Sequence, residues 1–186
     1  MSTPWRRIAA AARTELVNEQ RIDRATRATA PLDPPGWQLD HRPGSRVFRW
    51  DRRASTPLPG MQVVVKATLR TTDFSWWETA RDDVESIPFD VLLTKPSGHC
   101  CHAHATLSNS KLRWQSAGFG RRDRNCYPGP RVAELSLPLK NEIAAFFAAA
   151  GVTSSFLETA AQQLHYHEHL AYLSWLSSLE DFAAGR

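Results

Sequence analysis

The chain has 186 residues, of which 42% are hydrophobic, and its formal net charge is +4. A chain of this length buries roughly 70% of the surface that its unfolded form exposes, so we expect one domain over residues 1–186. The sequence contains no run of about 18 consecutive apolar residues, which excludes a membrane-spanning helix. Two of the three cysteines are adjacent, and three cannot all pair within one chain, so free thiols and a reducing compartment are expected.

Charge is unevenly distributed along the chain. Residues 1–53 contain eleven arginines against six acidic residues, a net charge of +5, whereas residues 138–186 have a net charge of −3. Clustered arginine and a pI near 9.2 fit an anionic partner such as RNA or an acidic protein surface. An ordinary solvated surface is the alternative. Residues 1–13 have three arginines and no acidic residue, which resembles a mitochondrial import signal that is retained and also fits a first helix.

The apolar spacing divides the chain into three parts. Pro4 opens a stripe of apolar residues at helical spacing, which predicts a helix over residues 4–28. Short alternating runs separated by turn residues predict an antiparallel meander over residues 36–137, closing with a short strand at 131–137. Helical spacing returns over residues 139–183 and predicts two closing helices. The order of elements is therefore helix, sheet, helices.

Local signals place the boundary between the two closing helices. Gly151 stands where a glycine commonly ends a helix, and Thr153 or Ser154 can cap the helix that follows. In the meander, Ser108-Asn109-Ser110 is a turn sequence between two strands.

Two segments resemble a known family. The run Glu142–Phe156, continuing through Glu168-His169 to Phe182, is similar to the closing helices of the mitochondrial acidic matrix proteins, also called the mitochondrial glycoprotein family. Leu16–Arg21, followed after a spacer by Gly36-Trp37, resembles the first helix of that family and the strand after it. With the meander between them, the resemblance spans nearly the whole chain.

The resemblance implies an α+β fold, a highly twisted seven-stranded antiparallel sheet flanked by N-terminal and C-terminal helices, in a ring-shaped trimer. It implies a mitochondrial matrix protein that binds other proteins and has no catalytic residue set. The positions that match the family in the helices are carried over as packing or subunit-contact candidates: Phe147, Leu164, Tyr172, Trp175 and Phe182.

The chain departs from this family in its charge. The family is typically strongly acidic, whereas this chain is basic. We therefore expect a different partner surface and a specialised subunit, in a homotrimer or a heterotrimer with related subunits, within a larger mitochondrial complex and without membrane insertion.

Ten arginines are the candidates for contact with RNA phosphates or acidic partners. They lie near the end of the first helix, around Trp50, and in a loop near the last predicted strand: Arg21, Arg24, Arg27, Arg46, Arg49, Arg52, Arg53, Arg121, Arg122 and Arg124. Trp76 and Trp77 are candidates for a protein interface, because two adjacent residues of an extended chain cannot both enter the same core.

Two histidine clusters are candidate metal sites. On a strand, Cys100, His102 and His104 point to one face, but a second pair of ligands is missing, so half-buried strand residues are the better interpretation. His165 and His169 lie one helical turn apart without the glutamate of a metalloprotease motif, and we expect surface or interface histidines there. We predict no catalytic residue, no metal and no cofactor.

These observations predict a non-catalytic scaffold subunit in the mitochondrial matrix, within a ribonucleoprotein assembly such as the mitochondrial ribosome or its assembly machinery. An accessory subunit on the matrix side of a respiratory-chain complex is the alternative. A metal-dependent enzyme ranks last.

Overall fold

The computed structural model describes residues 4–26, 30–42, 44–53, 58–68, 86–121, 127 and 129–185. The chain falls into two compact units, a sheet unit of Leu32–Ala161 and a helix unit of Met1–Pro31 with Gln162–Arg186. The elements in chain order are α1 (Pro4–Thr26), β1 (Gln38–Asp40), β2 (Val47–Arg53), β3 (Gln62–Thr68), β4 (Ser86–Thr94), β5 (His99–Ser108), β6 (Lys111–Arg121), the 3-10 helix η2 (Val132–Glu134), α2 (Leu137–Ala149) and α3 (Ser154–Ala184).

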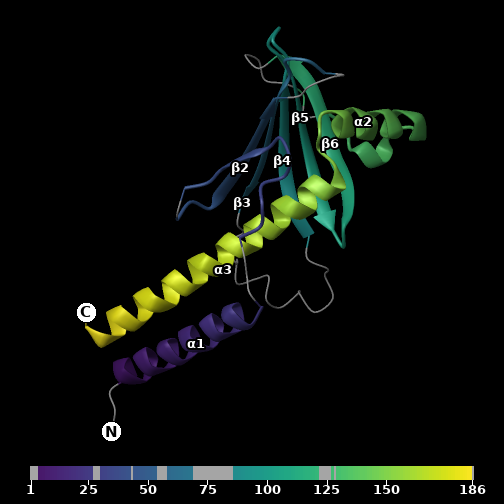
Figure 1. Ribbon diagram of the computed structural model, residues 1–186. Coiled ribbons are helices and arrows are strands. Elements are labelled where there is room, and N and C mark those ends of the chain that lie inside the picture. The colour runs from purple at the N-terminus through teal and green to yellow at the C-terminus, as the bar shows by residue number, and fades with distance from the viewer. Residues whose placement is uncertain are drawn as a thin grey trace. The chain divides into compact units, whose positions relative to one another are not determined.

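The sheet unit is built on an antiparallel meander. Its strands are paired in the order β1-β2-β3-β4-β5-β6, so every strand is bonded to its neighbour in sequence (Figure 1). The turn between β5 and β6 is the one predicted, and both Asn109 and Ser110 adopt positive φ, as tight hairpin turns of the primed types require. A bulge in the β5–β6 pairing follows His104 and brings Trp114 opposite Ala105.

Alternation along the strands gives the sheet a core face and a polar face. The core face carries fully buried side chains from the central strands: Phe48, Trp50, Val63, Val65, Phe89, Val91 and Ala103. Helix α2 lies beside β6 (Figure 1). Its Phe147 ring packs against Trp114 of β6, with ring centroids 3.9 Å apart. The first turn of α3 adds Phe156, which stacks on Trp37 with centroids 3.8 Å apart. The core of this unit therefore lies between the sheet and these helices.

The predicted strand at residues 131–137 is wrong. Arg131 makes a single bridge with Ser116 of β6, and the chain then turns into η2, where the amides of Glu134 and Leu135 donate to carbonyls three residues earlier. Pro138 in the first turn of α2 starts the helix at Leu137, which leaves too few residues for a strand. Within the residues described, the sheet has six strands where seven were expected.

The junction of α2 and α3 follows the predicted caps. Gly151 has φ of +92°, and the Val152 amide donates to the Phe147 carbonyl at 2.9 Å while the Gly151 amide donates to Ala148. This is the Schellman arrangement, and both Val152 and Phe147 are buried, which supplies its usual apolar contact. The Thr153 hydroxyl then accepts from the Phe156 amide at 3.2 Å and caps α3.

The helix unit pairs α1 with the C-terminal part of α3. Trp5 meets Phe182, whereas Glu15 meets Tyr172 and Asp23 meets His169, so the two helices run antiparallel (Figure 1). Among the residues described, no single helix is both long enough and apolar enough to cross a membrane. The pair α2 and α3, bent by 61°, meets the length and composition of a membrane span only when the two helices are taken together.

Candidate functional site

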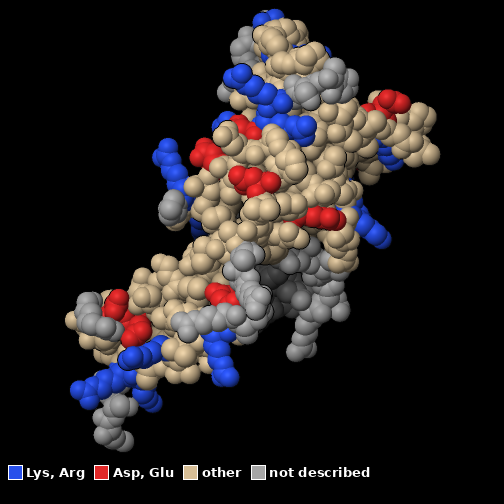
Figure 2. All heavy atoms as spheres, viewed as in Figure 1, with Lys and Arg blue, Asp and Glu red and all other residues tan. Residues whose placement is uncertain are grey.

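Helix α1 presents a basic face to solvent. Arg6, Arg13 and Arg21 are spaced by seven and eight residues, about two helical turns each, so they share one side of the helix over about 22 Å. All three are exposed, as is Arg7 at the margin of this side. In Figure 2, basic side chains gather along α1, at the lower left. We call Arg6, Arg7, Arg13 and Arg21 the α1 basic face.

The acidic residues of α1 lie on the opposite side and contact α3. The Tyr172 hydroxyl donates to Glu15 at 3.4 Å. Both ring nitrogens of His169 approach carboxylates, Nε2 at 2.9 Å from Asp23 and Nδ1 at 3.9 Å from Glu19, without a well-angled hydrogen bond from the buried Nε2. Loss of solvation and the negative charges of Glu15 and Glu19 raise the pKa of the Tyr172 phenol.

Because the acidic residues of α1 face α3, they do not neutralise the arginines of the α1 basic face. In the part of the chain that the structure describes, no ion pair involves Arg6, Arg7, Arg13 or Arg21, and the stretch of α3 in this unit contains no lysine or arginine. Among the described side chains of the helix unit, the positive charge is therefore concentrated on one side of α1. Of these four residues, only Arg21 was predicted to contact RNA or an acidic partner. The seven-residue spacing of Arg6 and Arg13 was the available signal for the rest of this face. Arg24 lies in α1, but its side chain, like Arg27, is outside the described residues.

The arginines of β2 have different surroundings. Arg49 donates two hydrogen bonds of 2.7 Å to the Asp51 carboxylate, and this contact raises the pKa of the guanidinium. Arg52 lies on the core side, its guanidinium carbon 5.7 Å from the centre of the Trp37 ring. Trp50 is fully buried, so it offers no stacking surface to a base. Arg49 and Arg52 are thus engaged within the chain.

Three other candidate arginines are exposed on the sheet unit. Arg46 precedes β2, Arg53 ends it, and Arg121 ends β6. Arg122 and Arg124 lie outside the described residues, and so do Trp76 and Trp77.

The interface candidates of the closing helices separate into buried and exposed residues. Phe147 and Leu164 are buried and act in packing. Tyr172, Trp175 and Phe182 are 38%, 57% and 69% exposed. Large aromatic side chains with this exposure on one helix are typical of an interaction surface.

The predicted alternation of β5 is confirmed. His102 and His104 lie on the polar face, where Asp90 of β4 is directly opposite His104, and Cys101 and Ala103 are buried on the core face. The sequence analysis missed Asp90, because its position beside His104 depends on strand register. Neither Cys100 nor Cys101 takes part in a disulfide.

We expect Cys101 to resist alkylation at pH 8 in the folded protein. Desolvation by burial, and to a lesser extent Cys100, raises the pKa of its thiol to about 12, so the reactive thiolate is scarce. Mass spectrometry of peptides after iodoacetamide treatment, with and without denaturant, measures this directly. Labelling of Cys101 at the same rate in both conditions would contradict its burial.

Comparison with known proteins identifies the family. The sequence model of the MAM33 family, described as mitochondrial glycoprotein, matches residues 78–183. The chain belongs to the mitochondrial glycoprotein family. This family is mitochondrial and generally consists of non-catalytic proteins that bind other proteins. The resemblance predicted from the terminal segments is thereby confirmed.

Two solved structures have the same fold as this member of the mitochondrial glycoprotein family. One is a hypothetical protein from Leishmania major, described as a sequence homologue of human p32, with a TM-score of 0.77, 24% identity and coverage of 95% of this chain and 97% of that chain. The other is Trypanosoma brucei p22, with a TM-score of 0.76, 21% identity and coverage of 98% and 100%. Among curated protein sequences, none matches this chain.

Proposed function

We propose that this member of the mitochondrial glycoprotein family is a non-catalytic scaffold subunit of a ribonucleoprotein assembly in the mitochondrial matrix. The observation that carries the proposal is the α1 basic face, in which exposed arginines stand apart from the acids of the same helix. A row of guanidinium groups over about 22 Å suits successive phosphates of a nucleic acid, because arginine donates to phosphate oxygens in a bidentate way. The mitochondrial ribosome or its assembly machinery is the specific parent complex proposed.

The exposed arginines of the sheet unit support the same partner class. Arg46, Arg53 and Arg121 are proposed as further contacts to RNA or to acidic protein surfaces. We do not assign this role to Arg49 and Arg52, because the Asp51 carboxylate and the Trp37 ring already occupy their guanidinium groups.

We propose that the exposed aromatic residues of α3 form contacts between subunits, in a trimer of identical chains or with related chains. Tyr172 and Trp175 stack with ring centroids 6.0 Å apart, and Phe182 contacts Trp5 edge-on at 5.6 Å. These aromatic pairs remain largely open to solvent in the single chain, and an obligate subunit interface would bury them.

Affinity purification from mitochondria tests the proposed assembly. The tagged protein is recovered before and after nuclease treatment, and the proteins and RNA that accompany it are identified. Ribosomal proteins and ribosomal RNA that are lost together after nuclease support the proposal. Recovery of respiratory-chain subunits that nuclease does not change would replace it with the accessory-subunit alternative.

We expect the variant Arg6→Gln/Arg13→Gln/Arg21→Gln to bind single-stranded RNA with a weaker salt dependence. Each phosphate contact contributes about 0.7 to the slope of log affinity against log salt concentration, so three lost contacts lower the slope by about 2. Fluorescence anisotropy over a salt series measures the slope. The control Lys95→Gln/Lys111→Gln/Arg113→Gln removes three exposed cations from the sheet unit. An equal decrease of the slope in both variants would mean that net charge alone determines RNA binding, and would contradict the assignment of the contacts to α1.

We expect Trp175→Ala to lower the molar mass of the assembled protein toward that of one chain. The substitution removes a side chain that is 57% exposed, so the fold of the single chain should survive it. Size-exclusion chromatography with light scattering measures the mass, and Phe119→Ala, which removes a ring that is 58% exposed on the sheet unit, is the control. A variant that keeps the mass of the wild type would argue against α3 as the contact.

A further inference from the structure

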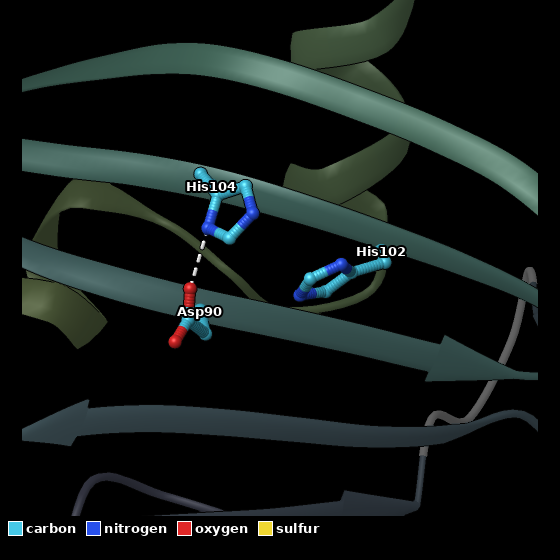
Figure 3. Close-up of side chains that lie close together, drawn as sticks. All are labelled: Asp90, His102 and His104. Atoms are coloured by element: carbon cyan, nitrogen blue, oxygen red, sulfur yellow. Dashed lines mark hydrogen bonds and ion pairs between the residues drawn. The ribbon is translucent and has the colours of Figure 1, made fainter. Parts of the chain in front are cut away.

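A cluster of metal-ligating side chains lies on the polar face of the sheet. His102 and His104 come from β5, and Asp90 comes from β4, directly opposite His104 in the antiparallel register. Nδ1 of His104 is 2.5 Å from a carboxylate oxygen of Asp90, and the two imidazole rings are 4.6 Å apart between centroids (Figure 3). One ligand atom from each of the three residues lies within 4.8 Å of the others. Two adjacent strands thus bring three donors to one place.

The chemistry of this cluster favours a cation over a structural role. All three side chains are exposed, so the burial of an apolar core does not account for their position. A neutral imidazole is the form that binds a metal ion, because its lone pair is free.

We propose that Asp90, His102 and His104 form a binding site for a divalent transition metal ion, with zinc(II) as the ion that two imidazoles and one carboxylate suit best. These donors are of intermediate hardness, and three protein ligands leave one tetrahedral position for water or a further ligand. Donors on one tetrahedral zinc lie roughly 3.3–3.6 Å apart, which side chains on neighbouring strand positions reach by rotation about their own bonds. The inference is independent of the proposed scaffold function.

The sequence predicted no metal here, because a zinc site normally takes a second, separated pair of ligands and the sequence showed none. The third donor, Asp90, comes instead from the neighbouring strand: it precedes His104 by fourteen residues but lies opposite it in the register. The pairing of β4 with β5 therefore supplies the third ligand that the sequence of β5 alone lacks.

A neighbouring lysine lowers the affinity of this cluster for a metal ion. Lys66 of β3 is paired in register with Asp90, on the side of β4 away from His104. Its positive charge weakens the attraction of the cluster for a divalent ion by Coulomb repulsion. Removing this charge should strengthen binding, whereas removing a lysine elsewhere should not.

Isothermal titration of the full-length protein with zinc chloride tests the proposal. We expect one high-affinity zinc ion per chain, a loss of at least tenfold in affinity for His102→Ala and for His104→Ala, and about tenfold for Asp90→Asn. Lys66→Gln should bind zinc a few-fold more tightly.

His99→Ala is the matched control. His99 lies on the same strand but on the other face, beside Ser97, so its loss should leave the zinc affinity unchanged. His102→Gln and His104→Gln keep the side-chain bulk if an alanine variant folds poorly.

Cobalt(II) substitution adds a spectroscopic test of the donor set. An absorption spectrum with ligand-field bands and no thiolate-to-cobalt charge-transfer band is expected. The proposal is overturned by the absence of zinc binding, by full affinity in the His102→Ala/His104→Ala double variant, or by a thiolate band that assigns the ion to a cysteine.

Discussion

Replacing Phe147 with alanine is expected to lower the free energy of unfolding of the sheet unit by about 3–5 kcal/mol. The Phe147 side chain is fully buried and stacks on Trp114 at 3.9 Å, with the rings 19° from parallel. Truncation removes this stacking and leaves a cavity between α2 and the sheet, which the surrounding backbone cannot fill. Urea denaturation followed by tryptophan fluorescence measures the change.

Phe119→Ala is the control for this experiment. Phe119 is 58% exposed, so its truncation should cost less than about 1 kcal/mol. If Phe147→Ala were as mild as Phe119→Ala, the packing of α2 on the sheet through the Phe147 ring would be contradicted.

The second large effect is expected at Gly151, where alanine should cost about 2–3 kcal/mol. The position requires φ of +92°, which costs an L-residue about 1–2 kcal/mol. An added Cβ would also meet the guanidinium of Arg52, so that side chain must leave its place beside Trp37. The same urea denaturation measures the loss.

A double-mutant cycle separates the two causes. In an Arg52→Ala background the steric part disappears, so Gly151→Ala should cost about 1 kcal/mol less than in the wild type. Gly98→Ala serves as the control for backbone conformation alone, because Gly98 has φ of +81° and no atom within 4 Å of an added Cβ. Equal costs in both Arg52 backgrounds would rule out the clash.

The sequence predicted those parts of the fold that local chemistry determines. The first helix was expected at residues 4–28 and spans Pro4–Thr26, and the caps at Gly151 and Thr153 are confirmed. These features depend on side chains within a few residues of one another. The run at 131–137 was mistaken for a strand because its short alternation fits a 3-10 turn between two prolines equally well.

The candidate sites were less predictable because they depend on residues distant in sequence. Arginine composition alone did not distinguish Arg49, which pairs with the Asp51 carboxylate, from the exposed Arg53 on the other side of Asp51 along β2. The position of Asp90 beside His104 depends on the register between β4 and β5. Pairing between these two strands carries that information, and spacing along β5 alone does not show it.

The two outermost strands of the meander limit how this protein can assemble. β1 has only three residues, and the outer strand β6 begins and ends with cations, Lys111 and Arg121, with Arg113 between them. Short edges and edge lysines or arginines disfavour the addition of a foreign strand, because pairing would leave like charges close together or too few backbone hydrogen bonds. Among the strands that the structure describes, both outer edges therefore disfavour the fusion of sheets from different chains into open-ended fibres.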